Sequence, residues 1–236
     1  MAELNLMSQI VDDDSAYFLK MFDIDCVSPK DINDVINSLD PNEDLTINIA
    51  SPGGMVDPAQ VMFSAISNIS KTHPTTCNIV GTAASSATLV AMAASIINIS
   101  PAGMMMIHKA SCDISNANSD DLQGVTQMMD ETDQMIANIY QKRTGLPEDQ
   151  LLQMMSDTTW MNAQSCVKNG FADGIMDMSN AQEQEAVMTN SVGRLISAKS
   201  IKKMKALIEK SDKLDQSEDE TKTNDKQAII REALGY

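Results

Sequence analysis

One serine stands where a nucleophile could be activated. Ser85 lies within the run of glycine and small residues from Gly81 to Ala87, between the strand-like Thr75–Val80 and the helical segment Leu89–Ala94. At such a strand-to-helix junction, unpaired N–H groups and the positive end of a helix dipole favour a developing negative charge. The small neighbours would let a peptide approach closely. The alternative is an ordinary serine cap on a buried helix.

A serine nucleophile also needs a base and donors for an oxyanion. The chain has two histidines. His73 precedes a proline in a loop and is expected at the surface, whereas His108 ends a buried-looking strand, where parallel sheets place functional groups. A structural role for His108 is the alternative. Gly53-Gly54 follows another strand and could present backbone N–H groups, although a helix-entry turn would use the same residues.

The elements that must position these residues alternate between strand and helix. Such alternation predicts an α/β fold with a parallel sheet covered by helices. Ser28-Pro29-Lys30-Asp31 is a strong helix start, and Asp12-Asp13-Asp14 is read as a turn. Strands are expected at 4–11, 45–50, 75–80, 95–100, 104–107 and 171–175. Helices are expected at about 29–39, 57–70, 89–94, 119–142, 147–155 and 162–169, and residues 17–24 fit either a strand or a short helix.

The chain changes character beyond about Met178. We expect one domain at residues 1–178 and a polar, charged extension at 179–236 that holds short helices and a disordered, linker-like stretch at 211–226. Residues 1–179 carry 23 acidic and 7 basic side chains, whereas residues 180–236 carry 10 of each.

Composition excludes several classes of protein. A net charge of −16 argues against nucleic acid as a partner, because nucleic-acid binding needs basic contacts to phosphate. The 4 cysteines lack Cys-x-x-Cys spacing and are read as reduced thiols of a cytosolic protein, with neither disulfides nor a metal site. No signal peptide is expected, and the apolar stretch 83–99 is too polar and short to span a membrane. With 3% aromatic residues and 19 methionines, the core must be filled by Met and aliphatic side chains.

Three motifs, in order, carry a resemblance to a known family. Ser51-Pro52-Gly53-Gly54, Gly81-Thr82-Ala83-Ala84-Ser85 and Met106-Ile107-His108 resemble the proteolytic subunit of the Clp-type serine peptidases. Thr144-Gly145 and the segment from Trp160 to Asp173 extend the resemblance to about residues 4–178. The Trp160 segment and the short 111–118 loop are most similar to the phage and prophage members that process head proteins.

The resemblance implies a role for each matching residue. Ser85 would be the nucleophile and His108 the general base, while the N–H groups of Gly53 and Ser86 would form the oxyanion hole. Ser86 replaces the methionine usual in the family and would be the fallback nucleophile. The resemblance also implies substrate-binding residues, namely Gly54, Met55, Cys112, Asp113 and Ile114, with 112–118 as a strand that binds the substrate backbone.

The third member of the triad is less clearly placed. An ungapped match puts Thr158 where the family has its acid, two residues before the aromatic at Trp160. Asp157 is one residue earlier, and we predict that a local shift brings it to His108. Otherwise Thr158 or a backbone carbonyl orients the imidazole, and the enzyme is closer to a dyad.

The family's fold and assembly follow from the same resemblance. The fold would be a crotonase-like α/β spiral of repeated β-β-α units with a protruding handle helix, here about 119–143. The assembly would be a homo-oligomer built as a heptameric ring or stacked rings. No cofactor is implied. The expected function is an ATP-independent or partner-fed endopeptidase in the host cytoplasm that trims phage capsid or scaffold protein. The alternatives are a housekeeping subunit fed by an AAA+ unfoldase, a crotonase-fold enzyme acting on acyl-CoA, and an inactive ring component.

Overall fold

The computed structural model describes residues 2–177, 196, 200–203, 205 and 206. The chain divides into two compact units, Met1–Val192 and Gly193–Tyr236. The first unit contains all elements discussed below. The expectations for residues 179–236 fall almost entirely outside the described residues, so the division into domains at residue 178 stays a prediction.

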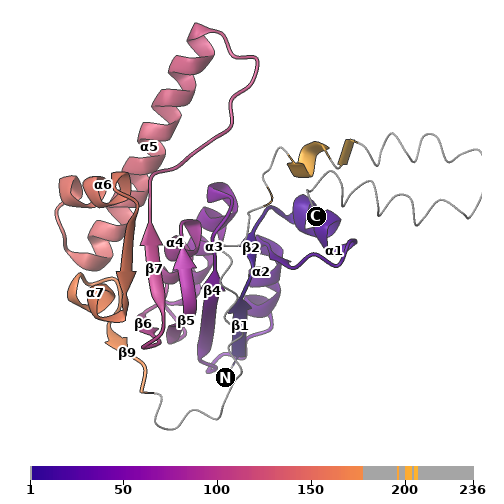
Figure 1. Cartoon of the computed structure of the whole chain (residues 1–236). Coiled ribbons are helices and arrows are strands. Elements are labelled where there is room, and N and C mark those ends of the chain that lie inside the picture. The colour runs from indigo at the N-terminus through magenta and orange to yellow at the C-terminus, as the bar shows by residue number, and fades with distance from the viewer. Residues whose placement is uncertain (1, 178–195, 197–199, 204, 207–236) are drawn as a thin grey trace, which may run out of the picture. The chain divides into compact units, whose positions relative to one another are not determined.

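A seven-stranded sheet forms the centre of the first unit (Figure 1). The main path of the sheet runs β1-β4-β5-β6-β9, and β7 and β8 branch from β5. All pairs are parallel except β7 with β8, so the predicted parallel α/β architecture is confirmed. The strands are β1 Ala2–Leu6, β4 Leu45–Ser51, β5 Thr75–Ala84, β6 Ile96–Ile99, β7 Met104–Ile107, β8 Thr159–Asn162 and β9 Gly174–Ile175.

Strand β5 splits the sheet into two branches. Residues 76–79 pair with β6, and residues 82–84 pair with β7. The strand is longer than the predicted 75–80 because its second half finds a separate partner. This second branch carries β5 directly to Ser85 and β7 directly to His108, so the fork places the two predicted reactive side chains side by side.

Seven helices accompany the sheet within residues 2–177. Helix α2 begins with the predicted cap, where the Ser28 N–H donates to Asp31 Oδ2 at 2.8 Å. Helix α4 is buried along its whole length, as its apolar sequence predicts. The helices are α1 Asp13–Lys20, α2 Pro29–Asn37, α3 Val56–Ile69, α4 Ser86–Met92, α5 Ser119–Thr144, α6 Glu148–Ser156 and α7 Ala163–Lys168.

The structure corrects the reading of the first thirty residues. The predicted strand 4–11 is two strands, β1 and the short β2 (Gln9–Ile10), which pairs with β3 (Cys26–Val27). The predicted turn at Asp12 is instead the start of α1, because the Asp12 side chain accepts a hydrogen bond from the Ser15 N–H at 2.6 Å. An aspartate cap and a turn have the same local sequence, and only the helix that follows distinguishes them.

The long helix α5 has two different halves. Its first half projects away from the sheet (Figure 1), and there Leu122 and Met128 are 47% and 54% exposed. Its second half packs on the core through Asp133, Ile136, Ala137 and Tyr140, which are all buried. This packed half lies next to the predicted site.

Candidate active site

Ser85 occupies a strained turn between β5 and α4. Its backbone angles are φ 54° and ψ −131°, in a region that residues with a side chain seldom adopt. The Ser85 N–H donates to the Met106 carbonyl at 2.9 Å, so β7 holds the turn in place. This geometry lifts the hydroxyl out of the helix, and Ser85 therefore does not cap α4 with its side chain.

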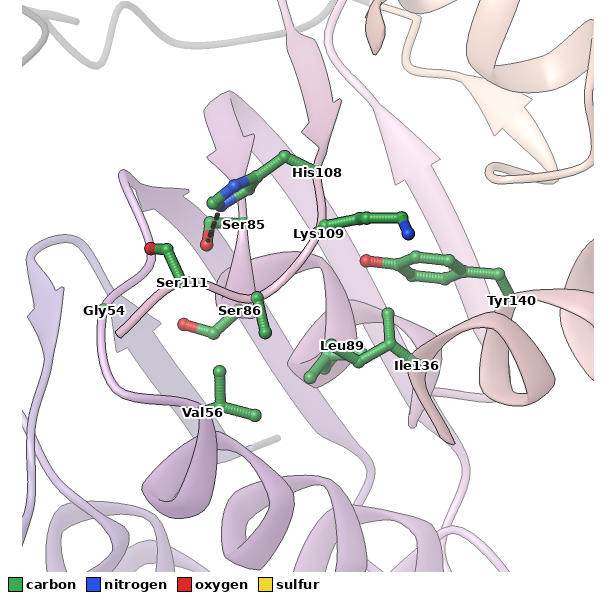
Figure 2. A pocket seen from close by; sticks show the side chains of 11 residues that line it. Gly54, Val56, Ser85, Ser86, Leu89, His108, Lys109, Ser111, Ile136 and Tyr140 are labelled. Atoms are coloured by element: carbon green, nitrogen blue, oxygen red, sulfur yellow. Dashed lines mark hydrogen bonds between the residues drawn. The ribbon is translucent and has the colours of Figure 1, made fainter. Parts of the chain in front are cut away.

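His108 lies directly opposite the Ser85 hydroxyl. Its Nε2 is 2.7 Å from Ser85 Oγ, and Figure 2 shows the imidazole turned toward the hydroxyl. When the imidazole is neutral and protonated on Nδ1, Nε2 can accept the hydroxyl proton. Burial lowers the pKa of His108, and the nearby carboxylate of Asp133 raises it in part, with a net lowering. A lowered pKa keeps the imidazole neutral, which is the form a general base needs.

Gly53 and Gly54 lie so close to neighbouring backbone that no side chain would fit at either position. A Cβ on Gly53, whose φ is +86°, would lie 2.5 Å from the Ala84 carbonyl oxygen and 2.9 Å from the Ser86 nitrogen. A Cβ on Gly54 would lie 2.1 Å from the Ile10 carbonyl oxygen. The two glycines are therefore required by close backbone approach as well as by their conformation.

The two predicted oxyanion donors differ in their present partners. The Ser86 N–H begins α4 beside Ser85, where helix N–H groups have no partner within the helix. The Gly53 N–H donates to Ser51 Oγ at 3.1 Å, so it would have to exchange this partner to bind an oxyanion. The Ser86 hydroxyl is buried and has no hydrogen-bond partner among the described residues. The oxyanion roles of both residues stay predictions.

A small cavity of about 50 Å³ opens beside the Ser85–His108 pair. In Figure 2 Val56, Leu89 and Ile136 give it an apolar wall. Such a wall suits a small apolar side chain of a substrate better than a charged one. The lining residues are Gly54, Val56, Ser85, Ser86, Leu89, His108, Lys109, Ala110, Ser111, Ile136 and Tyr140.

Only Gly54 of the predicted substrate-binding residues lines this cavity. The Met55 N–H donates to the Ile10 carbonyl ahead of α3, and Cys112, Asp113 and Ile114 are exposed. The predicted strand at 112–118 is wrong for the single chain, because residues 108–118 form no regular element. A strand needs a neighbouring strand to satisfy its backbone groups, and none lies beside this segment within the described residues. Binding of a substrate by these residues stays a prediction.

The predicted acid lies at the end of α6. Asp157 is exposed, and its Oδ1 accepts a hydrogen bond from Gln153 Nε2 at 2.8 Å. Its alternative, Thr158, adopts a left-handed backbone with φ 51°. Neither residue is hydrogen-bonded to His108 among the contacts of the described residues, and the partner of His108 there is Ser85. A role for Asp157 or Thr158 in orienting the imidazole therefore remains a prediction.

Sequence reasoning missed the contribution of α5 to the site. Tyr140 OH lies 2.6 Å from Thr88 Oγ1, which donates to the Ser85 carbonyl oxygen at 2.5 Å. Asp133 is a buried carboxylate on the same face of the helix. The signal was present, because Asp133 falls at helical spacing with Ile136 and Tyr140 on an otherwise apolar face.

Two further properties bear on the class of site. Among residues 2–177 and the few described beyond them, no group of three His, Cys, Asp or Glu side chains lies close enough to hold a metal ion. No helix in the described part of the chain is long and apolar enough to cross a bilayer.

The chemistry that the arrangement of Ser85 and His108 supports is transfer of the Ser85 proton to His108 and attack by Ser85 on an electrophile.

Comparison with known proteins places this geometry in context. The Clp protease family model matches residues 28–179. The ATP-dependent Clp protease proteolytic subunit of Dehalococcoides mccartyi is 30% identical over 139 residues, which cover 58% of this chain and 68% of that protein. The ATP-dependent Clp protease proteolytic subunit 1 of Chlamydia caviae is 25% identical over 183 residues, covering 74% of this chain and 95% of that protein.

A solved structure agrees with the fold. A point mutant of ClpP1 from Listeria monocytogenes superposes with a TM-score of 0.60 at 16% identity, covering 75% of this chain and 91% of that one. This confirms the predicted crotonase-like α/β fold with a handle helix.

Proposed function

Because this chain belongs to the Clp protease family, we propose that it is a serine endopeptidase in which Ser85 is the nucleophile and His108 the general base. The observation that carries the proposal is the distance of 2.7 Å between His108 Nε2 and Ser85 Oγ. The strained turn at Ser85 adds support, because such backbone strain clusters at functional sites.

The reaction follows from the positions of these atoms. Ser85 Oγ attacks the carbonyl carbon of the scissile peptide bond while His108 Nε2 takes its proton. The oxyanion that forms lies near the Ser86 N–H and the Gly53–Gly54 backbone, and hydrogen bonds there lower the barrier. The imidazolium then gives its proton to the leaving amine, which leaves an acyl ester on Ser85. Water, deprotonated by His108, hydrolyses this ester and regenerates the hydroxyl.

A fluorophosphonate probe tests the proposal. The wild-type protein should be labelled on Ser85, and Ser85→Ala should abolish labelling because no activated hydroxyl remains. Ser64→Ala, which changes an exposed serine on α3, is the matched control and should label like the wild type. Wild-type protein that stays unlabelled across the neutral pH range would contradict the proposal and favour an inactive ring component.

The proposed substrate is a capsid or scaffold protein of a phage head. The support is the similarity of the Trp160 segment to phage and prophage members, together with the charged sequence after residue 178. Co-expression with the capsid gene of the same genome should yield a truncated capsid protein, and Ser85→Ala should restore the full mass. A capsid protein of unchanged mass beside a probe-reactive enzyme would contradict this substrate.

The second candidate is degradation of unfolded proteins delivered by an AAA+ unfoldase. It is favoured by the curated relatives, which are named ATP-dependent Clp protease proteolytic subunits. With the unfoldase of the same host and ATP, the wild type should degrade an unfolded protein to short peptides. Capsid truncation without ATP and without an unfoldase would decide for the first candidate.

Either candidate includes assembly into rings in the cytoplasm. The exposed apolar side chains on the projecting half of α5, including Leu122 and Met128, are suited to contacts between copies of the chain. Sedimentation of the full chain should give the mass of a heptameric ring or a stacked pair. Met128→Lys should reduce that mass, because a lysine opposes burial of this surface.

A further inference from the structure

Helix α5 carries a buried carboxylate that holds the chain immediately after His108. The side chain of Asp133 is only 7% exposed. Its Oδ1 accepts a hydrogen bond from the Ala110 N–H at 2.8 Å, and its Oδ2 lies 3.7 Å from Lys109 Nζ. Both contacts are to the two residues that follow the imidazole in sequence, so Asp133 acts on the segment that carries the base.

A second contact fixes the same segment from the other side. The Lys109 N–H donates to the Met155 carbonyl at 3.2 Å, at the end of α6. The backbone after His108 is thus held by α5 and α6, although residues 108–118 have no regular structure of their own. Without these contacts the imidazole would sit at the start of a free loop, and its distance to Ser85 would not be fixed.

The placement of this carboxylate is costly for the fold. Asp133 lies on the face of α5 that otherwise packs apolar or aromatic groups, including Ile136, Ala137 and Tyr140. Burying a charge is unfavourable unless hydrogen bonds and an opposite charge compensate. Here the Ala110 N–H and the Lys109 ammonium compensate in part. An apolar residue would fill this face at lower cost, which points to a role beyond packing.

The charged groups around His108 single out Asp133. Lys109 is the neighbouring cation, and its side chain points away from Ser85 in Figure 2. Tyr140 also faces the site from α5, but burial raises the pKa of its hydroxyl, which therefore stays neutral. Strand β5 and helix α4 present the hydroxyls of Ser85 and Ser86, and Asp157 at the end of α6 is exposed and bonded to Gln153. Asp133 is the buried anion among these groups.

We propose that Asp133 is the positioning carboxylate of this active site: it holds the backbone after His108 and stabilises the imidazolium that forms during attack by Ser85. The proposal rests on the proposed function, since the imidazolium exists only if His108 is the base. It assigns to a residue of the handle helix a role that the sequence had assigned to Asp157. It also makes the packing of α5 on the sheet a condition for activity.

The charge of Asp133 predicts the direction of a pH effect. Burial lowers the pKa of His108 and Asp133 opposes that lowering. Removing the negative charge therefore lowers the pKa further, and the imidazole stays neutral to a lower pH. Activity falls at acidic pH when His108 is protonated, and this acid limb of the pH profile should then move to lower pH. A role limited to packing would reduce the amount of folded protein and leave this limb in place.

The test measures kcat/KM for a small peptide ester against pH in the full chain. Asp133→Asn should lower the plateau by about 100-fold, the size of effect expected when a reacting group is slightly misplaced. It should also move the acid limb to lower pH. Asp133→Glu should recover part of the rate and restore the limb toward its wild-type position. Asp130→Asn, an exposed carboxylate on the same helix, is the matched control and should behave as wild type.

The outcomes separate this inference from the proposed function. A wild type that neither hydrolyses the ester nor reacts with the probe at Ser85 overturns the proposed function. An active wild type whose Asp133→Asn variant keeps its rate and its acid limb overturns the role of Asp133. If Asp157→Asn loses rate and moves the acid limb while Asp133→Asn does neither, the role belongs to Asp157.

A second variant keeps the test decisive if Asp133→Asn does not fold. Lys109 is exposed, so Lys109→Met should fold, and it removes the cation that faces Asp133. The net potential at the imidazole then becomes more negative, because the cation is lost and no longer offsets the charge of Asp133, and the pKa of His108 should rise. The imidazole can be titrated by NMR in a His73→Gln background, in which His108 is the remaining histidine. An unchanged or lowered pKa of His108 in Lys109→Met would overturn the proposal.

Discussion

The two sides of the candidate active site are held by different forces. On the side of the proposed nucleophile, Ser85 sits in a turn that the Gly53 backbone contacts so closely that a Cβ there would lie 2.8 Å from the Ser85 Cβ. On the side of the proposed base, His108 begins an irregular segment that is held by a few polar contacts, chiefly the bond from the Ala110 N–H to Asp133. Close packing of backbones fixes the Ser85 side. The carboxylate of Asp133, which is distant in sequence, fixes the His108 side.

This difference predicts how each side responds to mutation. Steric packing in a close-packed core does not adjust to an added atom, so atoms added on the Ser85 side should affect folding and activity together. A polar contact can be removed with less change to the core, so changes on the base side should affect activity more than stability. Three variants test this contrast, in order of decreasing expected effect.

The largest effect is expected for Gly53→Ala. The new Cβ would meet the Ala84 carbonyl oxygen at 2.5 Å in a residue with φ +86°, so roughly 3 kcal/mol of unfolding free energy should be lost. Probe labelling at Ser85 should fall with it. Chemical denaturation and labelling measure the two losses together. Gly124→Ala on α5 meets nothing within 4 Å and should instead stabilise by about 1 kcal/mol. A stable, inactive Gly53→Ala would break the comparison.

An intermediate effect is expected for Tyr140→Phe, which links the two sides. Because Thr88 Oγ1 donates to the Ser85 carbonyl, Tyr140 OH must donate to Thr88 Oγ1. Losing this buried bond should lower the unfolding free energy by about 1 kcal/mol and slow labelling a few-fold. Tyr17→Phe, at a position 74% exposed, is the control and should change neither quantity. Equal results for the two variants would show that the Tyr140–Thr88 hydrogen bond does not support the Ser85 side.

The smallest effect on labelling is expected for Ser86→Ala. The hydroxyl of Ser86 is buried and has no partner among the described residues, so its removal should raise the unfolding free energy by about 1 kcal/mol. The backbone N–H remains, and labelling should still occur at Ser85. Peptide mapping of the labelled protein identifies the serine. Labelling that persists in Ser85→Ala and disappears in Ser86→Ala would reverse the assignment of the nucleophile.

Prediction from sequence succeeded where local chemistry is sufficient. The strand-to-helix junction at Ser85, the glycine pair and the strand that ends at His108 are each specified by a few adjacent residues, and the structure has all three. Prediction failed where the partner is distant. The strand β8 was missed because its pairing with β7 joins segments more than fifty residues apart, such as Met106 and Trp160. The strand at 112–118 was predicted to pair with a substrate, and the single chain does not form it by itself.

The sequence by itself determined the family, the parallel α/β sheet and the candidate pair Ser85 and His108, because these depend on short motifs and their order. Only the tertiary structure decided which carboxylate lies near His108. Asp133 and Asp157 are both acidic residues downstream of His108; the family resemblance favoured Asp157, and the helical spacing of Asp133 shows only that it shares the packed face of α5. Packing of α5 against the segment after β7 buries Asp133 and leaves Asp157 exposed. Burial and charge at one point in space depend on the whole fold, and no local pattern encodes them.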